Sequence, residues 1–146
     1  TEIVELDLTG EKKLKPYFLL VPVGEATARV YVPVETAEKR IRKAVTQSEA
    51  QKLIADVPEI GEITIRNEKE RELRYKEAVK SCDPVMLVSM IKTLYHRMEA
   101  RTAAGKKSTA MDERYFKMAE NHLYSELAFV LGRQKNEMNE IFKARV

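Results

Sequence analysis

Six basic residues stand close together in the middle of the chain, interleaved with glutamates. Ammonium and guanidinium groups bind phosphate, so such a cluster can hold an anionic partner, of which nucleic acid is the most common. The alternative is a solvated helix in which pairs such as Glu70–Arg74 and Glu72–Lys76 neutralise one another. The pattern alone favours this alternative and leaves the first interpretation open. The cluster comprises Arg66, Lys69, Arg71, Arg74, Lys76 and Lys80, with Glu68, Glu70, Glu72 and Glu77 between them.

Residues suited to catalysis or metal binding are few and far apart in the sequence. Cys82 is the only cysteine, which excludes an internal disulfide and a multi-cysteine metal site. His96 and His122 are 26 positions apart and do not form a helical ligand pair. The sequence also contains no phosphate-binding glycine loop and no nucleophile elbow. We therefore expect a non-enzymatic protein with no metal or cofactor, in which these three side chains have structural or surface positions.

The charge of the chain is divided unevenly between its two halves. Of 146 residues, 44% are hydrophobic and 34% are charged, which is enough apolar material for a packed core. Residues 1–65 hold 9 Lys/Arg and 11 Asp/Glu, a net of −2, whereas residues 66–146 hold 17 and 12, a net of +5. A basic second half is typical of an anion-binding module.

We also expect a cytoplasmic protein. The sequence has no run of about 20 apolar residues and no signal segment. The single cysteine fits a reducing compartment.

The first third of the chain has the alternating pattern of short strands. We predict strands over 1–8, 17–23 and 28–34, joined by turns at Thr9-Gly10-Glu11 and Gly24-Glu25. Pro22 removes a ladder donor, so the second strand should lie at an edge or end there. Short connections make the three strands an antiparallel meander. Because the chain opens at Thr1 in the middle of a strand pattern, we expect that one or two strands of this module precede it.

The remainder of the chain has helical periodicity and clear helix boundaries. We predict capping at Ser48, a helix ending before Pro58, and a connector over 59–67. We predict four further helices: one over 68–80, one that starts at Asp83-Pro84, one that starts after Thr109, and one over 134–144. A polar loop should cover 101–107. The expected inward residues include one continuous stripe, Leu87, Ile91, Leu94 and Met98, on the Asp83 helix, and Tyr115, Ala119, Leu123, Leu127 and Val130 on the Thr109 helix.

Together these patterns predict an α+β protein of two modules. The first is an antiparallel β module over residues 1–47, incomplete at its start. The second is an all-α helical bundle over residues 48–146, with a linker around 58–67.

Four segments follow one another over essentially the whole chain: YFLLVPV and ARVYVPVETAEK, then RELRYKEAVKSCDPVMLVSMIKTLYHR, and finally TAMDERYFKMAENHLYSELAFVLG. In this order they resemble the CarD/CdnL family of bacterial transcription regulators. The resemblance implies a Tudor-like β module that docks on the β subunit of bacterial RNA polymerase. It also implies a helical bundle that contacts promoter DNA and modulates the stability of the open complex.

Two positions depart from the family pattern. The family usually has a tryptophan at the start of the RYKE helix, where it wedges into the minor groove; the matching residue here is Arg71, and the chain has no tryptophan. The family also has a basic residue on the strand that faces polymerase. The matching residue in this chain is Tyr31, and Arg29 lies two positions before it. The resemblance thus implies polymerase contacts by Arg29 and Tyr31, and DNA contacts by Arg71, Arg74 and Lys76.

The sequence therefore predicts a non-enzymatic transcription regulator that binds RNA polymerase and promoter DNA. Its DNA contacts should go to phosphates, so we expect little sequence specificity. The alternative is a protein-interaction adaptor whose helical bundle binds another protein and no DNA. The missing tryptophan favours the adaptor, and the +5 charge of the second half favours DNA binding.

Overall fold

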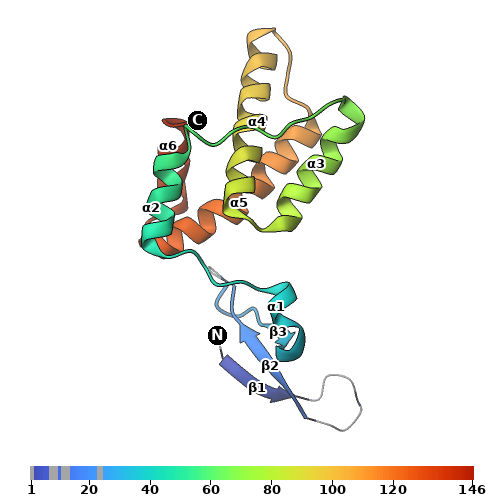
Figure 1. Ribbon diagram of the computed structural model, residues 1–146, viewed down its shortest axis with the longest axis vertical. Helices are drawn as coiled ribbons and strands as arrows, with labels where there is room; N and C mark the ends of the chain where they lie inside the picture. The colour runs from blue at the N-terminus through green and yellow to red at the C-terminus, as the bar shows by residue number, and fades with distance from the viewer. Residues whose placement is uncertain (1, 7–9, 11–13, 23–24) are drawn as a thin grey trace. The chain divides into compact units, whose positions relative to one another are not determined.

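The computed structural model describes residues 2–6, 10, 14–22 and 25–146 (Figure 1). The protein is α+β, with a small three-stranded antiparallel sheet followed by helices. The chain divides into two compact units, Thr1–Ala44 and Val45–Val146, whereas the boundary was predicted at 47/48. Six residues between the last helix of the first unit and the first helix of the second, 41–46, have no regular secondary structure.

The β unit contains the predicted meander. Strands β1 (Glu2–Leu6), β2 (Lys15–Leu20) and β3 (Val30–Pro33) pair in the order β1-β2-β3, with Val4 opposite Tyr17 and Phe18 opposite Val32. The second strand is the central one, and it ends two residues before Pro22, which is the second of the two outcomes predicted for it. Thr1, Asp7, Leu8, Thr9, Glu11, Val23 and Gly24 of the predicted strands and turns lie outside the described residues.

The sheet is followed by a 3₁₀ turn (Val34–Thr36) and the short helix α1 (Ala37–Arg40). Helix α2 (Gln47–Asp56) then begins at Thr46, so the predicted cap at Ser48 is wrong. The Thr46 hydroxyl accepts the amide of Glu49, at 3.2 Å, and this places Ser48 inside the first turn.

Four longer helices complete the helical unit: α3 (Glu68–Ser81), α4 (Pro84–Ala103), α5 (Ala110–Leu131) and α6 (Lys135–Lys143). Asp83 and Thr109 cap α4 and α5 as predicted, each accepting a backbone amide of the first turn. The loop predicted from residue 101 begins later, because α4 continues to Ala103. Gly105 then takes a positive φ of 73° and ends the helix, with the Lys106 amide bonded back to the Arg101 carbonyl at 2.8 Å.

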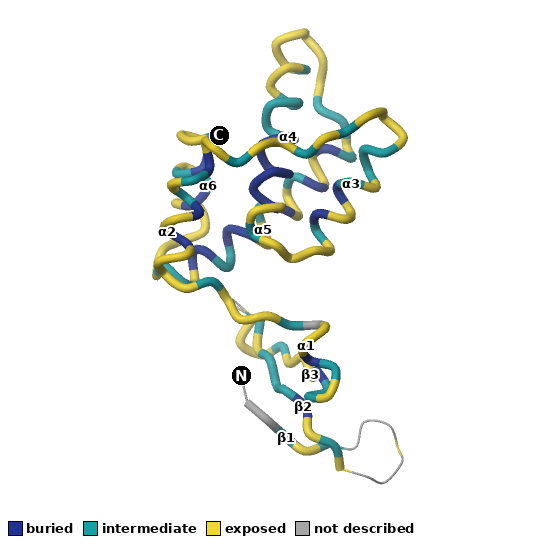
Figure 2. Tube along the Cα trace, in the orientation of Figure 1, coloured by how far each residue is buried: buried dark blue, intermediate teal, exposed yellow. Residues whose placement is uncertain are grey.

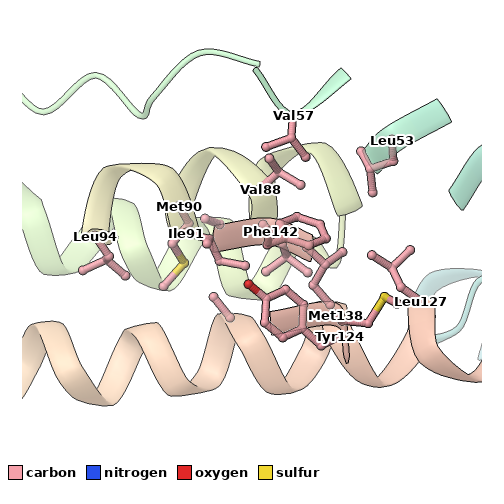
Figure 3. Packing of buried hydrophobic residues seen from close by; sticks show 14 of the residues in the cluster. Leu53, Val57, Val88, Met90, Ile91, Leu94, Tyr124, Leu127, Met138 and Phe142 are labelled. Carbon is pink, nitrogen blue, oxygen red and sulfur yellow. The ribbon is translucent and has the colours of Figure 1, made fainter. Parts of the chain in front are cut away.

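The core of the helical unit is built around α4. Leu87, Ile91 and Leu94 of the predicted stripe are buried, and Met98 is half-buried. Burial is wider than one stripe, however, because all eight residues 87–94 are buried (Figure 2). Figure 3 shows Phe142 and Met138 of α6 converging with Tyr124 of α5 and Val88 of α4. The rings of Tyr124 and Phe142 are 4.9 Å apart between centroids. None of the described helices has the length and apolar character needed to cross a membrane.

The stretch predicted as a linker, 58–67, is a packed part of the helical unit. Ile60, Ile63 and Ile65 are half-buried against the core. The ammonium of Lys92 on α4, which is itself buried, donates to the carbonyls of Val57, Pro58 and Ile60 at 2.8, 3.2 and 2.6 Å. All three carbonyls lie after the last residue of α2, Asp56, so these bonds fix the segment that follows the helix to α4.

Candidate nucleic-acid interface

Helix α3 presents a basic stripe to solvent. Asn67 caps the helix by accepting the amide of Glu70 at 3.1 Å, which sets the rotation of all later residues. Exposed positions then follow at spacings of four, three and four, the period of one helix face. The members of this stripe, which we call the lysine stripe, are Lys69, Leu73, Lys76 and Lys80.

Leu73 makes the lysine stripe partly apolar. This residue is 55% exposed. The neighbouring Lys76 is also largely exposed and pairs with Glu72 at 3.6 Å, one of the two pairs that the sequence predicted. Ammonium groups around an apolar contact point suit a partner with anionic and apolar surface.

Arg71, predicted to contact DNA, lies on the other side of the helix. Its Nε and Nη2 atoms donate to the two carboxylate oxygens of Glu68 at 3.0 and 2.9 Å, and its Nη1 donates to the phenol of Tyr75 at 3.1 Å. Only 13% of its side chain is exposed. A residue two positions after Lys69 is turned by about 200°, so the lysine stripe and Arg71 cannot share a face.

Arg74 is also turned away from the lysine stripe. It pairs with Glu77 at 3.2 Å, in place of the expected pairing with Glu70. Arg74 and Glu77 line a hollow of 370 Å³ that also includes Arg66 and Glu62. Of the three residues predicted to bind DNA, only Lys76 therefore belongs to the exposed stripe.

Arg97 on α4 joins three helices, a role that sequence reasoning missed. Its Nε donates to Asp112 of α5 at 2.8 Å, and its Nη1 and Nη2 donate to Glu68 of α3 at 3.3 and 3.4 Å. The Asp112 carboxylate is fully buried. The available sequence signal was the position of Arg97 three residues after Leu94, beside the apolar stripe of the same helix.

These ion pairs change the acid–base properties of the cluster. Hydrogen bonding by Arg71, with the charges of Arg71 and Arg97, lowers the pKa of Glu68 from 4.5 to about 2 despite some burial. The hydrogen bonds that Arg71 donates to Glu68 raise the pKa of Arg71. Burial raises the pKa of the Tyr75 phenol, and the bond from Arg71 opposes this effect. Glu68 is therefore an anion over the whole physiological range.

A second group of contacts connects α3 to α5. The Oε1 atom of Glu72 accepts from Arg114 at 3.2 Å and from the phenol of Tyr115 at 3.1 Å. The Arg114 guanidinium lies 5.0 Å from the centroid of the Tyr115 ring. These contacts fix α3 along its middle, so the lysine stripe is carried on a positioned helix.

The other candidate residues of the helical unit lie apart from the lysine stripe. His96 contacts Glu62, and His122 is exposed on α5. Cys82 is exposed and takes a left-handed conformation, φ 53°, where α3 ends. Within the described residues, no group of three or more His, Cys, Asp or Glu is arranged to hold a metal.

The two residues expected to contact polymerase are exposed in the β unit. Tyr31 belongs to β3, opposite Leu19, and is 41% exposed. Arg29 lies just before β3, and its guanidinium donates to the carbonyls of Ala26 and Ala28 at 2.5 and 2.9 Å. The loop therefore fixes the direction of Arg29, which precedes β3 although the strand was predicted over 28–34.

No protein-family model matches this chain, and a search of curated proteins found no significant match.

Proposed function

We propose that this protein is a non-enzymatic regulator of bacterial transcription, similar to the CarD/CdnL family. The observation that carries the proposal is the lysine stripe of α3, in which three exposed ammonium groups surround an exposed leucine on one helix face. The net charge of +5 over residues 66–146 supports an anionic partner. In this proposal the helical unit is a bundle that contacts promoter DNA.

The chemistry of the lysine stripe favours phosphate contacts over base reading. Lysine is a flexible point charge without the planar fork that recognises guanine. Phosphate contacts fix the position of a protein on a duplex and carry no sequence information. We therefore propose that the helical unit binds DNA with little sequence preference and modulates the stability of the open complex.

The β unit is proposed to dock on the β subunit of RNA polymerase as a Tudor-like module. Exposed apolar residues on and beside its sheet support a protein partner, since such a surface is typical of interaction sites. These residues are Leu14, Val21, Val30 and Tyr31. Arg29 adds a positive charge beside Tyr31.

Binding of the full chain to duplex DNA tests the helical part of the proposal. We expect the logarithm of the affinity to fall linearly with the logarithm of the salt concentration, with a slope of about −0.9 for each phosphate contacted. Replacing Lys69, Lys76 and Lys80 by Gln should weaken binding and reduce the slope by up to about one unit for each lysine.

A matched variant separates the lysine stripe from net charge. Lys52, Lys135 and Lys143 lie on α2 and α6, and Figure 1 shows these helices on the side of the helical unit away from α3. Their replacement by Gln removes the same charge and should leave the salt slope nearly unchanged. Absence of DNA binding at low salt, with polymerase binding intact, would contradict the DNA proposal and favour the protein adaptor.

A pull-down with purified core polymerase tests the β unit. Replacing Arg29 and Tyr31 by Glu should abolish retention of the full chain and leave DNA binding unchanged. Both side chains are exposed, so the fold should tolerate the change. Retention of the double variant at the level of the unaltered protein would place the docking surface elsewhere.

A further inference from the structure

Glu68 is held between two arginines that come from different helices. Its two carboxylate oxygens accept four contacts, from Arg71 on α3 at 3.0 and 2.9 Å and from Arg97 on α4 at 3.3 and 3.4 Å. Two guanidinium groups facing one anion form the arrangement that proteins use for bidentate binding of carboxylate or phosphate.

The three members of this cluster differ in how firmly they are fixed. Arg71 and Arg97 are only 13% and 23% exposed, and each has a second partner within the protein. For Arg71 this partner is the phenol of Tyr75, and for Arg97 it is the buried carboxylate of Asp112. The Glu68 side chain is 69% exposed. The arginines therefore stay in place when the carboxylate swings into solvent.

The same two arginines line an open hollow of 350 Å³. Thr93 and His96 contribute further polar groups to its wall, and Glu62, which contacts His96, stands at the same hollow. An anion that enters from solvent can thus reach both guanidinium groups. Asp112 already neutralises one of the two arginines, so the cluster has a net charge of 0 with Glu68 in place and +1 when Glu68 is displaced.

We propose that Arg71 and Arg97 form a phosphate-binding site, which Glu68 occupies as an internal substitute until a phosphate group displaces it. This inference rests on the proposed function for the identity of the ligand, a backbone phosphate of DNA. Because Arg71 and the lysine stripe lie on different faces of α3, this phosphate belongs to a different part of the DNA backbone from those at the stripe. Arg71 then binds phosphate together with Arg97, and it does not insert into the minor groove as the family tryptophan does. The unbound protein keeps both arginines neutralised, which weakens its binding to other anions.

The variant Glu68→Gln tests the substitution directly, because amide and carboxylate have the same shape but only the carboxylate carries charge. The full chain with Glu68→Gln should bind duplex DNA about fivefold more tightly at low salt, as expected from releasing two partly exposed ion pairs. Its salt slope should be steeper by about 0.9, the value for one additional phosphate contact.

Two further variants distinguish this site from a general effect of charge. Glu113→Gln removes the same charge from the first turn of α5, where its side chain accepts only from Ser108 among the contacts of the described residues, so it should leave the slope unchanged. Glu68→Gln combined with Arg71→Lys retains the positive charge and removes the fork, so it should lose the gain. Circular dichroism checks that each variant is folded.

Titration with inorganic phosphate, followed by calorimetry, separates this inference from the proposed function. Phosphate should bind Glu68→Gln more tightly than the unaltered protein. Equal affinity of the two proteins for both phosphate and DNA would overturn the inference while leaving DNA binding intact. Tighter phosphate binding by Glu68→Gln, without DNA binding by any variant, would support the anion site and overturn its assignment to DNA.

Discussion

A single buried carboxylate, Asp112, determines where Arg97 points. The carboxylate is completely buried at the start of α5 and accepts from Arg97 at 2.8 Å. Its other oxygen, Oδ1, is buried without a hydrogen-bond partner among the described residues. An anion in this position is tolerated only because a cation faces it.

Replacing Asp112 by Ala should therefore destabilise the protein strongly. Removing one member of a buried ion pair costs about 3–5 kcal/mol, and the value here should lie near about 3 kcal/mol because Arg97 keeps Glu68 as a partner. Urea denaturation measures the change. Glu113→Ala, next in sequence and exposed, should change the free energy of unfolding by less than about 0.5 kcal/mol.

At acidic pH, the free energy of unfolding should depend on the ionisation of Glu68. The pKa of this carboxyl falls from 4.5 to about 2 on folding. Because folding lowers this pKa, the ion pairs stabilise the protein fully at pH values above the pKa of Glu68 in the unfolded chain. The stabilisation is lost as the pH falls to the pKa of Glu68 in the folded protein. The stability difference between the unaltered protein and Glu68→Gln should thus be constant above about pH 5 and vanish near about pH 2. A difference that persists below about pH 2 would contradict the ion-pair origin.

At the scale of elements, Lys92 fixes the course of the chain between α2 and α3. Three backbone carbonyls accept from its ammonium, and Thr93 beside it accepts the amide of Ile63 at 2.9 Å. The segment after α2 is consequently part of the packed unit.

Lys92→Met should keep the aliphatic volume and leave the three carbonyls without their donor. Because hydrogen bonds to charged groups contribute about 1.5–3 kcal/mol, we expect a loss of about 2–3 kcal/mol in urea denaturation. Hydrogen exchange should increase in residues 57–63 before it does so elsewhere. The control Lys52→Met, at an exposed pair with Asp56, should have little effect. Unchanged exchange at 57–63 would show that Lys92 does not hold this segment.

Helix boundaries were predictable where one residue alone could serve as the cap. Asp83 before Pro84 and Thr109 before Ala110 each match an N-cap motif that no second motif overlaps. Near the start of α2, two overlapping motifs compete, Thr46 with Glu49 and Ser48 with Gln51. Tertiary contact decides between them, since the Val45 amide donates to Glu126 of α5 and fixes the chain just before Thr46. Local rules contain no information about such a partner 81 positions away.

At the scale of the whole molecule, the sequence predicted the α+β order and which segment would be basic. It did not predict which basic residues face solvent. Arg71 and Lys76 are both cations in the same helix, and only the cap at Asn67 and the partners on α4 and α5 decide that one is covered and the other exposed. The Arg97–Asp112 pair depends on two helices meeting, so no pattern within either helix predicts it.

The stretch between the two units has defined ends, and these give it a maximum length. The Ile41 amide is bonded to Ala37 within the β unit at 2.8 Å, and the Val45 amide is bonded to Glu126 within the helical unit at 2.9 Å. Four Cα steps separate these anchors, so the stretch spans at most about 15 Å. If each unit holds its own partner, binding of the second becomes intramolecular, with an effective concentration in the millimolar range when the bound complex keeps residues 41 and 45 within this reach and near zero when it does not. On the proposed function, residues 42–44 would therefore exclude complexes in which the two bound units hold these anchors farther apart.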